Sequence, residues 1–123
     1  MFNMRVSFDF DFTLSRPVVQ KYARELISRG YELWIVTSRP LIIDNTDLLE
    51  VARTLGIPKE RIVFTTFGPK SEPMLEINPI FHLDDDPIEL EGINSLTQTK
   101  GVSCWNNTSW KGKCERILNL SGK

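Results

Sequence analysis

Residues 4–14 have the sequence MRVSFDFDFTL, a short apolar run that ends in two acids. The part Met4–Phe10 predicts a buried strand, because apolar runs of this length with β-branched and aromatic residues are typical of sheet interiors. Asp9 and Asp11 then lie at the carboxyl end of that strand. The stretch therefore predicts a sheet with acidic side chains at one edge.

Apolar runs and amphipathic stretches alternate along the rest of the chain. In Pro17–Arg29 the apolar residues recur at i, i+4 and i+8, which predicts a helix with proline in its first turn and Gly30 after its last. The β-α-β-α-β order predicts an α/β fold, a three-layer α/β/α, Rossmann-like domain around a parallel sheet of about five strands. Further strands are expected at Leu33–Val36, Arg61–Thr65, Ile80–Leu83 and Val102–Trp105, and further helical segments at 46–55, Ser71–Ile77 and Cys114–Leu120.

The size and charge of the chain bear on the number of domains and on the partners to expect. We expect a single domain over residues 1–123. A net charge of -1 gives no support to strong non-specific binding of nucleic acid. No apolar run approaches the roughly 20 residues that span a bilayer, and the N-terminus lacks the basic and apolar regions of a signal peptide. We therefore expect a cytoplasmic protein with no membrane partner, in which Cys104 and Cys114 are reduced thiols.

Polar side chains follow three of the expected strands, at the point where each strand ends. In parallel α/β sheets, ligands bind beyond the carboxyl ends of the strands. Five carboxylates at one edge repel one another unless a cation neutralises them, and hard oxygen ligands favour Mg²⁺. The sequence therefore predicts a Mg²⁺ site here, with Asp86 also suited to cap a helix before Pro87. The residues at this edge are Asp9 and Asp11, then Thr37 and Ser38, then Asp84, Asp85 and Asp86.

The same residues, taken in order, resemble motifs one to four of the haloacid dehalogenase-like superfamily of phosphotransferases. Residues 9–13, DFDFT, fit the pattern D-x-D-x-T after a strand. Thr37 follows the second strand, Lys70 follows the third, and Asp84-Asp85 closes the fourth, with Glu89 beyond. The resemblance runs from the first strand through Glu89. It implies an enzyme, a Mg²⁺-dependent phosphoric monoester hydrolase that works through an aspartyl-phosphate intermediate.

This resemblance also implies a role for each residue. Asp9 would be the nucleophile, and Asp11 would protonate the leaving group and then activate water. Thr37 would donate a hydrogen bond to a phosphoryl oxygen, and Lys70 would neutralise charge on it. An acid at position 11 favours a phosphatase or phosphomutase within the superfamily. The implied Mg²⁺ ligands are Asp9, the backbone carbonyl of Asp11, and Asp85, with Asp84 as the alternative to Asp85.

The substrate is constrained by what the chain lacks. The segments between Asp9 and Thr37 and between Ser38 and Lys70 are filled by the expected elements, so we expect no cap domain over the site. An uncapped site needs either a large phosphorylated substrate or a lid from a neighbouring subunit of a homo-oligomer. Residues 37–39, TSR, also resemble the Thr/Ser-x-Arg pattern of the 3′-phosphatase domain of phage-type polynucleotide kinases. That resemblance implies Ser38 and Arg39 as substrate-binding residues, and nucleotides or nucleic-acid ends as substrates.

Two other functions remain open. A phospho-receiver signalling domain shares the length, the parallel sheet and an aspartyl-phosphate, but its acceptor acid ends the third strand, where this chain has Thr65 and Thr66. A non-catalytic member of the same superfamily would use the fold as a binding module. We expect His82 to be structural, and Trp105 and Trp110 either to pack in the protein or to stack on a base or sugar ring.

Overall fold

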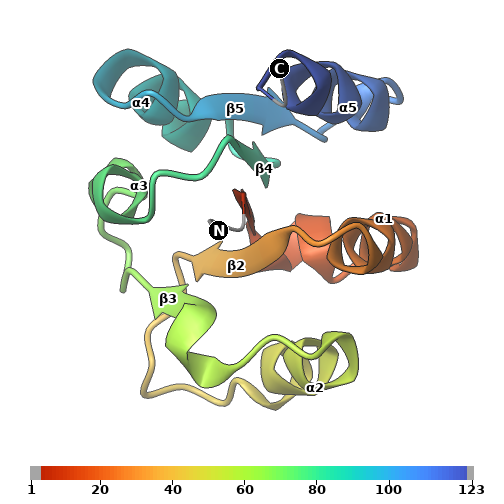
Figure 1. Ribbon diagram of the computed structural model, residues 1–123. Helices are drawn as coiled ribbons and strands as arrows, with labels where there is room; N and C mark the ends of the chain where they lie inside the picture. The colour runs from red at the N-terminus through yellow and green to blue at the C-terminus, as the bar shows by residue number, and fades with distance from the viewer. Residues whose placement is uncertain (1–3, 122–123) are drawn as a thin grey trace.

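The computed structural model describes residues 4–121, whose five strands form one parallel sheet in the order β3-β2-β1-β4-β5. Helices α1, α2 and α5 cover one face of this sheet, and α3 and α4 cover the other (Figure 1). The three-layer α/β/α, Rossmann-like fold is therefore confirmed, and residues 4–121 contain no cap domain. The strands are β1 (Arg5–Phe8), β2 (Glu32–Thr37), β3 (Ile62–Phe64), β4 (Phe81–Asp84) and β5 (Lys100–Ser103); the helices are α1 (Pro17–Ser28), α2 (Thr46–Leu55), α3 (Ser71–Ile77), α4 (Pro87–Leu96) and α5 (Trp110–Ser121), with short turns η1 (Phe10–Leu14) and η2 (Lys59–Arg61).

Two apolar layers hold the helices to the sheet. The larger lies under α1, α2 and α5 and includes Val6 and Phe8 of β1. The smaller lies under α3 and α4 and contains Val36, Met74, Ile77 and Ile93. Because successive strand residues point to opposite faces, Ser7 lies on the α3 side, with its Oγ 3.6 Å from the sulfur of Met74. The alternation along β1 thus assigns a polar side chain to the thinner layer.

The predicted elements differ from the observed ones mainly at their ends. The first strand stops at Phe8, because the chain then folds into η1, where the amide of Leu14 donates to the carbonyl of Asp9 at 3.1 Å. The fifth strand is Lys100–Ser103 and not Val102–Trp105, since Val102 pairs with Leu83 in the middle of β4. Trp105 therefore lies beyond the sheet.

The helix ends follow the expected chemistry. Pro17 begins α1, and Gly30 and Gly56 after α1 and α2 have positive φ angles of 93° and 75°, which glycine adopts without steric cost. The predicted cap of α4 is confirmed, since the carboxylate of Asp86 accepts the amide of Ile88 at 2.9 Å. The last helix begins at Trp110, four residues before the predicted Cys114, because Trp110 packs in the core.

Two further observations concern the cysteines and the length of the helices. Cys104 and Cys114 are both buried and free, as predicted. None of the helices within residues 4–121 combines the length and the apolar character that crossing a bilayer requires.

Candidate active site

The sheet order creates a crevice between the carboxyl ends of β1 and β4. The chain leaves β1 toward β2 and β3 on one side, and leaves β4 toward β5 on the other. Such a reversal of strand order is where ligands bind in open α/β sheets. Asp9 follows β1 directly, while Asp84 ends β4 and Asp85 follows it. These residues line a pocket of about 460 Å³, together with Lys70.

The alternation of side chains selects which residues enter this crevice. Ser7 of β1 pairs in register with His82 of β4, and the amide of Asp9 donates to the carbonyl of Leu83 at 2.9 Å, so the register continues one step past β1. Residues two apart in a strand share a face. Ser7 and Asp9 therefore lie on the same side as His82 and Asp84, facing α3.

Lys70 connects the two strand ends. It immediately precedes α3, and only 2% of it is exposed. Its Nζ lies 2.8 Å from Oδ1 of Asp9 and 2.7 Å from Oδ2 of Asp84. Burial opposes the ammonium charge, but the two carboxylates together raise the pKa of Lys70 above its ordinary value. The structure thus brings the predicted loop lysine into the floor of the pocket as a buried cation.

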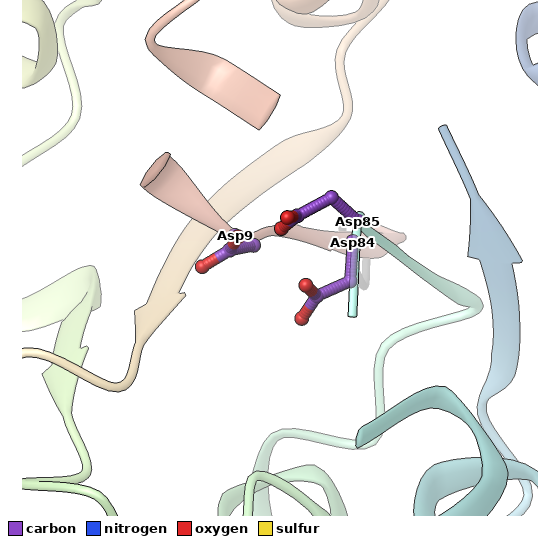
Figure 2. A group of neighbouring side chains, drawn as sticks. All are labelled: Asp9, Asp84 and Asp85. Atoms are coloured by element: carbon purple, nitrogen blue, oxygen red, sulfur yellow. The ribbon is translucent and has the colours of Figure 1, made fainter. Parts of the chain in front are cut away.

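Three carboxylates converge at the pocket. Asp9, Asp84 and Asp85 each offer an oxygen atom within 4.8 Å of the others, and Figure 2 shows Asp84 and Asp85 extending toward the side where Asp9 lies. Burial and the nearby Asp84 raise the pKa of Asp9 to about 8, although Lys70 opposes the shift. Burial also raises the pKa of Asp85. Full ionisation of all three carboxylates is therefore unfavourable with Lys70 as their shared cation.

The donor set fits a small, hard cation, because it consists of carboxylate oxygens. Asp84 is the most engaged of the three: Oδ2 accepts from Lys70 and contacts His82, and Oδ1 accepts the amide of Asp86 at 3.1 Å. Although burial opposes its charge, the contacts with His82 and Lys70 lower the pKa of Asp84. Asp85 forms no ion pair among residues 4–121, and Lys70 contacts only Oδ1 of Asp9, so Asp9 and Asp85 are better placed than Asp84 to hold a cation.

A buried hydrogen-bonded chain, which we call the relay, links Ser7 and His82 to Asp84. Nε2 of His82 lies 2.8 Å from Oδ2 of Asp84, and Nδ1 lies 2.8 Å from Oγ of Ser7. Burial lowers the pKa of His82, which favours the neutral ring. A neutral ring that donates from Nε2 to the carboxylate accepts at Nδ1 from the Ser7 hydroxyl. His82 is thus structural, as expected, and it orients a residue of the site.

Replacing His82 with Leu is expected to lower the free energy of unfolding by about 1–3 kcal/mol, because it removes a hydrogen bond from a buried carboxylate and one from Ser7. His82→Gln is expected to lose less, since its amide can still donate to Asp84. Urea denaturation of the three proteins at pH 7 measures the difference. An unchanged stability in His82→Leu would show that the relay has no energetic role.

Asp11 does not join the cluster. It lies in η1 with a side chain 44% exposed, and it forms a bidentate ion pair with Arg39 at 2.7 and 2.9 Å. All five carboxylates line the pocket, as expected for one edge of the sheet, but only Asp9, Asp84 and Asp85 form the close cluster, because Asp11 is paired with Arg39 and Asp86 caps α4. Strand alternation would place Asp11 on the same face as Asp9, but the alternation ends at Asp9, because η1 begins at Phe10.

Arg39 is fully engaged within the protein. Besides Asp11, it binds Asp47 of α2 at 2.7 and 2.9 Å, and its guanidinium lies 5.0 Å from the centre of the Phe10 ring. Its donors are directed at these two carboxylates, and its expected role in substrate binding stays a prediction. The observed contacts make Arg39 the residue that holds Asp11.

The remaining predicted residues divide between core and pocket. Thr37 is buried, its Oγ1 accepts the amide of Arg39 at 3.2 Å, and it does not line the pocket, whereas Ser38 does. Trp110 packs edge-to-face on Tyr22 with ring centres 5.6 Å apart, which makes it a core residue. Trp105 lies on the rim of the pocket.

Sequence reasoning missed two features of the site. It did not connect His82 with Asp84, although a spacing of two before a strand-end acid places both on one face. It also did not anticipate the pairing of Arg39 with Asp11 and Asp47, for which the sequence holds no signal because the three residues come from different loops and a helix.

Comparisons with known proteins support the fold. No family model matches the chain, and no curated protein matches it. A crystal structure described as an NADPH:quinone reductase from Bacillus thuringiensis has a similar fold, with a TM-score of 0.50 and 12% sequence identity. The alignment covers 97% of this chain and 44% of that one, so the chain spans less than half the length of that protein. At this identity the likeness shows an α/β, Rossmann-like fold alone.

Proposed function

We propose that the protein is a Mg²⁺-dependent phosphoric monoester hydrolase of the haloacid dehalogenase-like type, with Asp9 as nucleophile. The observation that carries this proposal is the buried ammonium of Lys70, held between Asp9 and Asp84 at the floor of an open pocket. Phosphoryl transfer needs a nucleophile in line with the leaving group and a nearby positive charge that neutralises the phosphoryl oxygens. Asp9 and Lys70 supply both within 2.8 Å of each other.

The reaction proceeds in two steps. A carboxylate oxygen of Asp9 attacks phosphorus, the bond from phosphorus to the leaving oxygen breaks, and that oxygen takes a proton from Asp11. Water then attacks the aspartyl-phosphate, gives a proton to Asp11, and releases inorganic phosphate and free Asp9. Lys70 stabilises the phosphoryl charge in both steps. Asp9, the backbone carbonyl of Asp11 and Asp85, or Asp84 in place of Asp85, would hold Mg²⁺, which would neutralise charge on the phosphoryl oxygens.

Arg39 acts in this scheme through Asp11. Asp11 lines the pocket, but both of its oxygens accept from Arg39, so Asp11 has to separate from Arg39 before it can give a proton to the leaving group. Because Arg39 is itself held by Asp47, the position of Asp11 depends on the start of α2. Substitution of Arg39 is therefore expected to change the turnover of every substrate rather than the preference among substrates.

The alternative functions receive less support. Receiver domains have the strand order 2-1-3-4-5, whereas this sheet has the order β3-β2-β1-β4-β5. A dinucleotide-binding fold has a glycine-rich turn after its first strand, and this chain has Asp9 and Asp11 there. The acidic turn therefore gives no reason to propose NADPH binding. The presence of Asp9, Asp11 and Asp85 together at the pocket favours catalysis over a purely non-catalytic binding module.

Metal removal and one substitution test the proposal together. We expect hydrolysis of p-nitrophenyl phosphate in Mg²⁺, its loss in EDTA and its recovery when Mg²⁺ is restored. Asp11→Asn is expected to lower kcat by at least ~10²-fold, the usual contribution of a general acid and base. The same variant is expected to accumulate phosphoenzyme, visible by intact-protein mass spectrometry. Full activity after thorough metal removal would refute the metal-dependent mechanism.

A further inference from the structure

A second cavity adjoins the catalytic pocket. It has a volume of about 590 Å³ and is lined by aromatic and polar side chains, among them Arg16, Asn106 and Thr108. Phe12 and Trp105 line both cavities. The two side chains therefore form the boundary between the place where we propose the phosphate binds and the neighbouring space. A substrate group that extends from that phosphate into the second cavity would contact Phe12 and Trp105.

These two aromatic rings contribute little to the folded core. Phe12 is 68% exposed and Trp105 is 65% exposed, so folding gains little from either side chain. Phe12 also has a positive φ of 60°, a backbone conformation that is unfavourable for a residue with a bulky side chain. An exposed aromatic residue in a strained conformation beside a pocket favours a role in binding over one in stability.

The two segments that carry the rings are fixed against each other. The sulfur of Cys104 lies 3.4 Å from Oγ1 of Thr13 and 3.8 Å from the carbonyl of Phe12. The loop after β5 is closed by its own hydrogen bonds: the amide of Trp105 donates to Oγ of Ser103 at 3.2 Å. Asn107 reinforces the loop by donating to the Ser103 carbonyl at 2.9 Å. The aromatic surface is therefore preorganised, which reduces the entropy lost on binding.

We infer that this second cavity binds the base of a nucleoside phosphate whose phosphoryl group lies at Asp9. This inference rests on the proposed function. A flat, polar heterocycle matches the lining, because aromatic rings stack on bases of any sequence and the polar side chains can hydrogen-bond to base edges. Arg16 adds a guanidinium that has no ion pair among residues 4–121 and can stack on a base or donate to it. The cavity lies in the size range of small-molecule sites.

The test compares two substrates that differ only in the base. Adenosine 5′-monophosphate and ribose 5-phosphate present the same phosphoester with and without the ring. We expect kcat/KM to be at least about tenfold higher for the nucleotide, the scale of one base-aromatic stack. Trp105→Ala and Phe12→Ala are each expected to remove most of that ratio. Leu96→Ala is the matched control, since it truncates an equally exposed apolar side chain (68%) at the far end of α4 and leaves the ratio unchanged.

Each outcome has a separate meaning. Equal kcat/KM for the two substrates, or a ratio unaffected by Trp105→Ala, would overturn the base-binding site while leaving the phosphatase intact. Absence of hydrolysis of any phosphoester would overturn the proposed function instead. In that case quenching of Trp105 fluorescence by adenosine 5′-monophosphate, lost in Trp105→Ala, would still establish base binding. A 3′-phosphorylated trinucleotide serves as a third substrate. If its kcat/KM exceeds that of adenosine 5′-monophosphate, the cavity takes the base of a nucleic-acid end; if the order is reversed, it takes the base of a free nucleotide.

Discussion

Asp9→Asn is expected to abolish turnover, with a loss of at least ~10³-fold on every phosphoester, because the amide cannot form the aspartyl-phosphate. Neither neighbouring acid is placed to replace Asp9 as nucleophile. Asp84 is engaged by Lys70 and His82, and Asp85 is partly exposed to solvent. Steady-state hydrolysis of p-nitrophenyl phosphate measures the loss. Near-normal activity in this variant would refute the assignment of Asp9 as nucleophile.

The same substitution has an opposite effect on stability without metal. Burial and Asp84 raise the pKa of Asp9 to about 8 from its usual 3.8. A raised carboxyl pKa means that its contribution to stability is fully present below about pH 4 and is lost as the pH rises through 8. Asn carries no such penalty, so in EDTA the Tm of Asp9→Asn should exceed that of the wild type by roughly 3 °C or more at pH 8.5, and by less at pH 5. Calorimetry at the two pH values measures this, and a less stable variant at pH 8.5 would contradict the charge argument.

Lys70→Met is the second substitution with a large expected effect. It leaves Asp9 and Asp84 buried beside each other without their shared cation. Breaking a buried ion pair by removing one partner costs about 3–5 kcal/mol, so we expect a loss of that order in the free energy of unfolding at pH 8 in EDTA. We also expect kcat to fall by at least ~10²-fold in Mg²⁺, the scale of one preorganised charge on the phosphoryl group.

Two further variants separate these effects. Lys59→Met removes an exposed lysine from η2 and is expected to change neither quantity. The double variant Lys70→Met/Asp9→Asn removes one of the two opposed carboxylates and is expected to recover part of the lost stability. Additive effects of the two substitutions, measured by urea denaturation, would show that Lys70 and Asp9 are not coupled.

Periodicity along the chain was sufficient to predict most of the fold. The spacing of apolar residues from Val19 to Leu26 specifies α1, because those residues form the face that packs on the sheet. The ends of elements were less predictable. Val102–Trp105 has the apolar character of a strand, but pairing of Lys100 with Phe81 sets where β5 begins. That register depends on the neighbouring strand, which local sequence does not contain.

The sequence by itself determined that acids follow β1 and β4, since a parallel sheet brings the carboxyl ends of its strands to one edge. Tertiary structure alone decided which acids meet. Asp9 and Asp84 converge because both continue the alternation of paired strands, while Asp11 stays outside the close cluster because η1 interrupts that alternation and Arg39 binds it. The burial of Lys70 and the approach of Phe12 to Trp105 were likewise decided by packing, because each brings together segments distant in sequence.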